Sequence, residues 1–147
     1  TSSIRRIEAA MLSYHADMTL KNNPFELGMD RLVDLDMEID FVSKAALTRI
    51  RDEGVSQLQV GLVFDGAPIS GSNDEYWPVL VDGQKVGQVT SAVYSPRLER
   101  NIALALVAVA HAGIGTKAMI DMSGEPRGCE IVQKPFFDPK KAIAAKG

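Results

Sequence analysis

Apolar residues near the start of the chain recur with the period of a helix. The stripe consists of Ile4, Ile7 and Met11. Ser2 or Ser3 stands just before it, and serine is a residue type that caps helix N-termini. A helix turns by about 100° per residue, so Arg6 falls on the face opposite the stripe, among small side chains. The pattern predicts a short helix that buries one side and presents one guanidinium on the other.

A second helical pattern follows the break that Pro24 makes in the chain. The helix is predicted over residues 43–53, with Asp40 or Ser43 as its N-cap and Gly54 just past its end. The residues expected to face inward are Val42, Ala46, Leu47 and Ile50.

After this helix the apolar period changes from about 3.6 to about 2, which is typical of half-buried strands. Residues 57–64 alternate in this way. Asp82 and Gly83 separate two short apolar runs and form a strong hairpin signal. A second hairpin is predicted around a turn at residues 123–126. The run from Ile102 to Val109 is apolar on both faces, which favours a central strand. The hairpin strands are expected over residues 79–81, 85–89, 118–122 and 128–133.

Five or six short antiparallel strands must remove their exposed edges, and a small closed barrel does so economically. The predicted fold class is therefore α+β, mainly β. An antiparallel barrel spans residues 55–147, preceded by two short helices and a loop in residues 1–54. The Asp82-Gly83 pair is expected to form an exposed type I′ turn. The predicted barrel core contains Leu58, Val60, Leu62, Ile102, Leu104, Leu106, Ile120 and Ile131.

Composition and charge narrow the classes of partner. The 147 residues include 16 Lys and Arg against 19 Asp and Glu, and no block of like charge predicts nucleic-acid or membrane binding. The longest apolar run is too short to span a bilayer, and the N-terminus lacks the regions of a signal peptide. The single cysteine, Cys129, allows no internal disulfide and suits a cytoplasmic protein. Thr1 stands directly before a helical pattern, which predicts a piece of a longer chain.

Several residue groups could suggest a metal or ligand site, but a structural role is expected for most of them. The four carboxylates of residues 34–40 lack the glycine and glutamate of a calcium loop, and a solvated strand face is expected instead. His15 and His111 show no metal-ligand spacing, so no metal site is predicted. Cys129 is expected to be a small buried residue in a strand, and residues 113–115 a turn. Tyr76-Trp77 is expected to cover the barrel mouth or to stack on a ligand.

Two sequence segments resemble those of a known family. Residues 5–14 read R-R-I-E-A-A-M-L-S-Y, and residues 89–106 read V-T-S-A-V-Y-S-P-R-L-E-R-N-I-A-L-A-L. They resemble the R-[LI]-E-A-x-M-x-x-Y and T-S-x-x-[YF]-S-P-x-L-x-x-x-I-A-L-A elements of the tetrahydrofolate-dependent glycine-cleavage T-protein (aminomethyltransferase) family. Within it, residues 23–33 (N-P-F-E-L-G-M-D-R-L-V) and 95–99 (S-P-R-L-E) look closer to dimethylsulfoniopropionate demethylase and its relatives.

The resemblance implies a C-terminal Greek-key barrel preceded by the tail of a folate-binding domain, with the catalytic aspartate upstream of this chain. It implies the C-terminal part of a tetrahydrofolate-dependent methyltransferase or demethylase that takes a methyl group from a small donor such as dimethylsulfoniopropionate. One alternative is a glycine-cleavage aminomethyltransferase, which docks a lipoylated carrier protein. Another is a non-catalytic barrel module that closes one side of a folate site. Under each of these hypotheses the fragment alone is expected to be inactive.

The resemblance also assigns candidate folate-binding residues. It places a folate-contacting arginine at Arg6, whereas periodicity alone favours a solvated side chain. Glu8 is a candidate for folate contact or for a buried ion pair. Tyr14 is a candidate for the pocket lining or for core packing. Residues 134–137 (K-P-F-F) resemble the family's K-P-F-[YF] ending, and Lys140 or Lys141 stands near the downstream position that reaches folate in the family.

Overall fold

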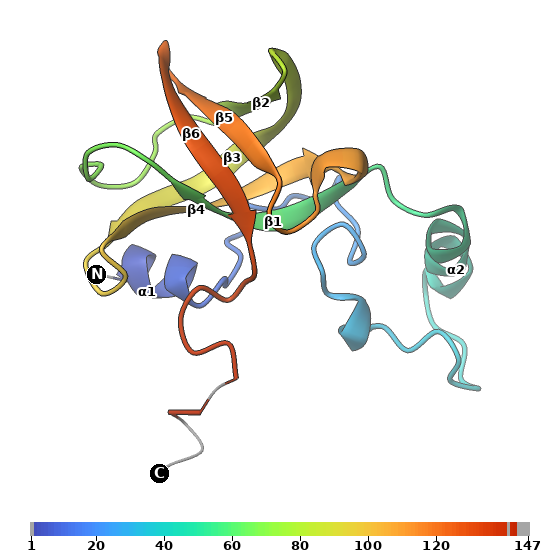
Figure 1. Ribbon diagram of the computed structural model, residues 1–147. Helices are drawn as coiled ribbons and strands as arrows, with labels where there is room; N and C mark the ends of the chain where they lie inside the picture. Colours follow the sequence, from blue (N-terminus) through green and yellow to red (C-terminus); the bar gives the residue numbers. More distant parts are fainter. Residues whose placement is uncertain (1, 141, 144–147) are drawn as a thin grey trace.

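Six antiparallel strands close into a barrel in the computed structural model, which describes residues 2–140, 142 and 143 (Figure 1). The strands are β1 (Gln57–Phe64), β2 (Trp77–Val81), β3 (Gln84–Ser95), β4 (Arg100–Ala108), β5 (Lys117–Met122) and β6 (Glu125–Val132). Their order around the barrel is β1-β4-β3-β2-β5-β6. β2, β3 and β4 are consecutive neighbours and β1 lies beside β4, which is a Greek-key arrangement. The predicted fold class is confirmed.

The helical elements are α1 (Ser2–Glu8), a 3₁₀ turn η1 (Asp30–Leu32), α2 (Lys44–Glu53) and a 3₁₀ turn η2 (Val109–His111). α1 packs against β3 and β4 on the outside of the barrel. α2 stands away from the barrel at the other end of the molecule (Figure 1), and none of its residues is buried. No helix in the part of the chain that the structure describes is long and apolar enough to cross a membrane.

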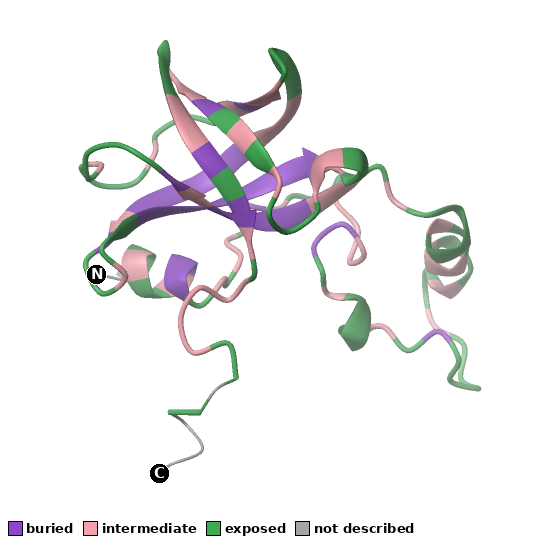
Figure 2. Cartoon of the chain, in the orientation of Figure 1, coloured by how far each residue is buried: buried purple, intermediate pink, exposed green. Residues whose placement is uncertain are grey.

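Two apolar clusters stabilise the molecule, one inside the barrel and one between the barrel and α1. The inner cluster includes Val60, Leu62, Phe64, Trp77, Val79, Val89, Ile120 and Ile131. The outer cluster is formed by Ile7, Val93, Ile102 and Leu104. Figure 2 shows β4 buried along most of its length, as a strand covered on both faces must be.

The predicted position of three core residues on β4 is wrong. Ile102 and Leu104 lie under α1 instead of inside the barrel, and Leu106 shares their side of the strand. The small residues of β4 face the barrel interior: Ala103, Ala105 and Val107. β4 is apolar on both faces, so its alternation could not distinguish the inside from the outside.

Both predicted hairpins form, with one difference in the turn. Asp82 and Gly83 have φ of 50° and 78°, the positive values that a type I′ turn requires at both central residues. The second turn is shorter than expected, because Ser123 and Gly124 alone make it, with φ of 53° and 95°. Pro126 already pairs with Asp121 in the strand ladder. The predicted four-residue turn is therefore wrong.

The N-terminal third departs most from expectation. Val42 is 94% exposed and Ala46 is also exposed, while Leu47 and Ile50 are only half-buried, so the predicted inward face of α2 is wrong. Met11 is 57% exposed because α1 ends before it. Residues 35–39 form bends instead of a strand face; the four carboxylates of residues 34–40 are exposed, and Leu35 between them is buried.

Candidate functional site

A bulge in β3 places polar side chains on the side of the barrel where α1 and the residues after it lie. The pairing of β3 with β4 shifts register between Val89 and Ser91, which leaves Thr90 as the extra residue. Asn73 occupies the backbone groups that the bulge frees: its amide donates to the carbonyl of Thr90 and accepts from the N–H of Ala92. The bulge thus brings two hydroxyls, those of Thr90 and Ser91, to the side where the N-terminal residues lie.

Asp17 is the centre of this face, and it is only 1% exposed. Its Oδ2 accepts from Arg6 Nη1 at 2.6 Å and from the backbone N–H of Ser13 at 2.9 Å. Its Oδ1 accepts from Thr90 Oγ1 at 2.6 Å. A buried carboxylate needs donors of this kind to offset its lost hydration, and Asp17 has three of them.

Arg6 is therefore an ion-pair partner instead of a solvated side chain, since its side chain is 24% exposed and held by Asp17. Its Nη1 also donates to the carbonyl of Met11 at 3.0 Å, and its Nη2 donates to Ser91 Oγ at 2.9 Å. A guanidinium carries five N–H donors. Among the described residues, one hydrogen of Nη2 and the Nε hydrogen of Arg6 have no partner.

Sequence reasoning missed Asp17 because nothing in the pattern brings it back to Arg6. The chain reverses after α1 at Ala10, which has a φ of 53°. A positive φ is uncommon outside glycine and is not signalled by alanine. Residues 10–18, here called the N-terminal turn, then fold over the helix face that carries Arg6.

Tyr14 projects from the N-terminal turn and is 49% exposed, so the core-packing alternative for it is wrong. Its ring lies 4.2 Å from that of His15, measured between centroids. The turn itself is tied to the barrel by Tyr76, whose hydroxyl lies 2.9 Å from the carbonyl oxygens of His15 and Ala16. Tyr14 thus leaves part of an aromatic side chain exposed on the N-terminal turn, next in sequence to Ser13, which donates to Asp17.

Glu8 is buried, with 4% exposure, and forms the ion pair that was one of its two predicted roles. Its Oε1 accepts from Ser95 Oγ at 2.5 Å, and its Oε2 lies 3.8 Å from Arg97 Nη1. Arg97 also stacks over the ring of Phe137, 4.1 Å from the centroid. The carbonyl of Glu8 accepts from the N–H groups of Phe136 and Phe137. Glu8 therefore joins α1, β3 and the C-terminal segment, and its carboxylate lies buried at this junction.

The remaining candidates have structural roles. Burial raises the pKa of Cys129 to about 11, which suits an inert core thiol. Trp77 lies in the barrel core, edge-on to Phe64, and does not cover the barrel mouth. Within the described residues no group of His, Cys, Asp and Glu is arranged to hold a metal ion. Lys140 is exposed, and Lys141 lies outside the described residues.

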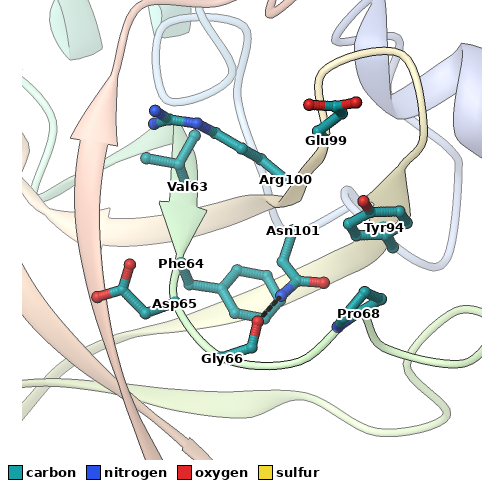
Figure 3. A pocket seen from close by; sticks show the side chains of 9 residues that line it. All are labelled: Val63, Phe64, Asp65, Gly66, Pro68, Tyr94, Glu99, Arg100 and Asn101. Atoms are coloured by element: carbon teal, nitrogen blue, oxygen red, sulfur yellow. Dashed lines mark hydrogen bonds between the residues drawn. The ribbon is translucent and has the colours of Figure 1, made fainter.

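A pocket of about 420 Å³ lies on another side of the barrel, where the β3–β4 turn meets the loop after β1 (Figure 3). Asn101 closes its floor by donating to the carbonyl of Gly66 and accepting from the N–H of Ile69. Figure 3 shows Asp65 and Glu99 on opposite sides of the pocket, so they do not form a pair for acid–base chemistry. None of the predicted site residues lines it.

Comparison with known proteins identifies the family of the barrel. The model of the family described as the glycine cleavage T-protein C-terminal barrel domain matches residues 58–138. An aminomethyltransferase of Synechococcus sp. (strain CC9902) is 40% identical over 132 residues, which cover 90% of this chain and 35% of that protein. An aminomethyltransferase of Symbiobacterium thermophilum is 37% identical over 134 residues, which cover 90% of this chain and 34% of that protein.

A solved structure shares the fold. The crystal structure of glycine cleavage system aminomethyltransferase T from Bartonella henselae superposes with a TM-score of 0.83 at 21% identity, over 92% of this chain and 38% of that chain. The chain thus spans about a third of the length of the curated relatives it matches.

Proposed function

This chain belongs to the glycine cleavage T-protein family, whose C-terminal barrel domain it contains, and we propose that it forms one wall of the tetrahydrofolate site of an aminomethyltransferase. The observation that carries the proposal is the coincidence of the R-x-E-A motif with a built polar face. Arg6, the arginine of that motif, is held by Asp17, and the exposed Tyr14 follows Ser13, whose N–H also donates to Asp17. Relatives that share 37–40% of their residues with this chain over the matched region are aminomethyltransferases.

The residues present fit a flat, hydrogen-bonding ligand such as the pterin of tetrahydrofolate. Arg6 has two N–H donors without a partner among the described residues, in addition to those bonded to Asp17, Ser91 and Met11. A guanidinium whose rotamer is already fixed loses little entropy when it binds, which favours affinity. Tyr14 supplies an exposed aromatic side chain on the same N-terminal turn that Asp17 ties to Arg6. Tetrahydrofolate, when bound, would supply the nitrogen that accepts the one-carbon unit.

Asp17 has the supporting role in this proposal. Its carboxylate sets the direction of the Arg6 guanidinium and ties the N-terminal turn to β3 through Thr90. Glu8 is not part of the proposed folate contact, because its carboxylate is buried, bonded to Ser95 and paired with Arg97. The catalytic aspartate of the family is expected in the part of the relatives that this chain does not cover.

A dimethylsulfoniopropionate demethylase is the second candidate, and one observation favours it. Residues 23–33 and 95–99 look closer to that branch, and Arg97 of the second segment takes part in the Glu8 ion pair. A sulfonium methyl group is already electrophilic, so such an enzyme mainly has to align donor and acceptor. The two candidates differ in the donor: an aminomethyl group on a lipoylated carrier protein, or a small sulfonium compound.

The test joins this chain to the other two thirds of the Synechococcus relative and offers each donor with tetrahydrofolate. We expect turnover with an aminomethyl-lipoyl carrier and none with dimethylsulfoniopropionate. Turnover with dimethylsulfoniopropionate alone would support the second candidate, and the absence of both activities in a protein with a cooperative melt would refute the proposal.

A binding measurement tests the role of Arg6. Arg6→Lys should weaken tetrahydrofolate binding by about 10-fold or more, whereas Arg51→Lys, an exposed control, should not. The 147-residue chain alone should show no turnover.

A further inference from the structure

A second pocket, remote from the β3–β4 turn, opens where β1 and β6 separate. The two strands pair only over residues 61–64 of β1, so the first half of β1 has no β6 neighbour. The pocket there has a volume of about 310 Å³. This volume lies at the small end of the range for small-molecule sites. The apolar residues that line it include Leu58, Val60, Ala112, Ile114 and Ile131.

The polar side chains of this pocket are Gln59, Lys134 and the exposed Gln133, and the first two are joined to each other. Lys134 Nζ donates a hydrogen bond to Gln59 Oε1. An ammonium group has donors only, so the Gln59 amide must turn its oxygen toward Lys134 and its nitrogen away. Gln59 is 4% exposed, and its Nε2 has no hydrogen-bond partner among the described residues. Buried amide nitrogens are rarely left without a partner, so this donor indicates an acceptor other than the described residues.

Lys134 is also without an ion-pair partner among the described residues. Burial lowers the pKa of Lys134 to about 8, and the charge of Asp17 opposes that shift. Asp17 is already engaged by Arg6, Ser13 and Thr90. In the part of the chain that the structure describes, no carboxylate forms an ion pair with Lys134. An anion would relieve the desolvated ammonium and the orphaned amide together.

We propose that this pocket binds a small carboxylate that carries an apolar chain. The carboxylate accepts a hydrogen bond from Lys134 Nζ and, after a rotation of the Gln59 side chain, from Gln59 Nε2. The apolar chain packs along the walls formed by Leu58 and Ile114. Ile114 is 73% exposed, so it has apolar surface left for a ligand to cover. A neutral ligand of the same shape leaves the ammonium uncompensated, and the site therefore discriminates by charge.

The test titrates the 147-residue chain with hexanoate and, as the matched neutral probe, hexanamide, and follows amide chemical shifts. Hexanoate should bind with a Kd in the millimolar range, about that of a fragment-sized ligand, and hexanamide about 10-fold or more weakly. Lys134→Met should weaken hexanoate binding by about 10-fold or more. Lys85→Met removes an exposed lysine on β3 and should leave it unchanged.

Gln59→Glu is the second variant, because it keeps the size of the side chain and gives Lys134 an internal carboxylate. It should fold and should also lose hexanoate binding, since the new carboxylate occupies the ammonium. Equal binding of hexanamide, an unchanged affinity in Lys134→Met or Gln59→Glu, or no hexanoate binding at about 20 mM would each overturn the proposal.

Discussion

The shorter of the two α-helices is the one that packs against the barrel, and the longer one buries no residue. α1 has 7 residues, and its Ile7 is completely buried against the barrel. α2 has 10 residues, and none of them is buried. Helices this short are marginal in isolation, so packing decides whether they are well held. The comparison shows that the polar face around Arg6 belongs to the barrel unit, whereas α2 buries no residue.

The difference between the helices comes from the segments that flank them. After α1 the N-terminal turn returns to the barrel and is held by Asp17, Thr90 and Tyr76. Around α2 the ion pairs are exposed, such as Arg51 with Asp36 at 3.5 Å and with Asp52 at 3.1 Å. Exposed pairs of this kind contribute about 0–1 kcal/mol. Equivalent substitutions in the two regions should therefore differ in their cost.

Removal of the Asp17 carboxylate should have the largest effect. Asp17→Ala leaves the partly buried Arg6 without its counter-charge and Thr90 without its acceptor, and breaking a buried pair costs about 3–5 kcal/mol of unfolding free energy. Asp52→Ala removes an exposed partner and should cost at most about 1 kcal/mol. Urea denaturation of both variants measures the two values. Similar small losses would mean that the face around Arg6 is no better held than α2.

Truncation of the apolar contacts should show a similar contrast. Ile7→Ala opens a cavity between α1 and β4 and should cost about 2–5 kcal/mol, as should Leu104→Ala beneath it. Leu47→Ala on α2 removes a half-buried side chain and should cost less than about 1 kcal/mol. Thermal melts of the three variants test this. A loss with Leu47→Ala as large as that with Ile7→Ala would show that α2 is packed after all.

The thiol of Cys129 reports on the barrel without changing it. Its pKa is raised from 9.0 to about 11, so the thiolate fraction near pH 8 is about 100-fold lower than in the unfolded chain. The raised pKa favours the protonated folded state, and this contribution to stability is lost as pH rises from about 9 through about 11. Labelling with a thiol reagent should be slow at pH 8 and fast in urea. Rapid labelling of the folded chain would contradict a closed barrel.

The barrel could be predicted from sequence because its signals are local. Alternating apolar residues mark each strand, and Asp82 with Gly83 tolerates the positive φ of the first turn. The error on β4 has a physical cause, since Ile102 and Ala103 are both apolar and only the position of α1 decides which faces inward. The inward face predicted for α2 failed because amphipathicity indicates a face but not a partner.

The site was predictable only in part. A motif suggested Arg6 and Tyr14, whose contact with folate stays a prediction, and the buried ion pair of Glu8 followed from its place beside the apolar stripe. Asp17 was missed because its contact with Arg6 depends on the reversal at Ala10, a conformation that alanine does not signal. Gln59 and Lys134 are 75 residues apart and meet only once the barrel has closed. Long-range pairs of this kind follow from topology and not from spacing.

The central claim is that Arg6 is held by Asp17, and that the proposed folate contact uses a guanidinium fixed in this way. A double-mutant cycle with Arg6→Met, Asp17→Asn and the double variant tests it most directly, with the unfolding free energy of each measured in urea without ligand. The account predicts a coupling of about 1–3 kcal/mol between the two residues. Additivity to within about 0.5 kcal/mol would contradict it and would return Arg6 to a solvated helix face.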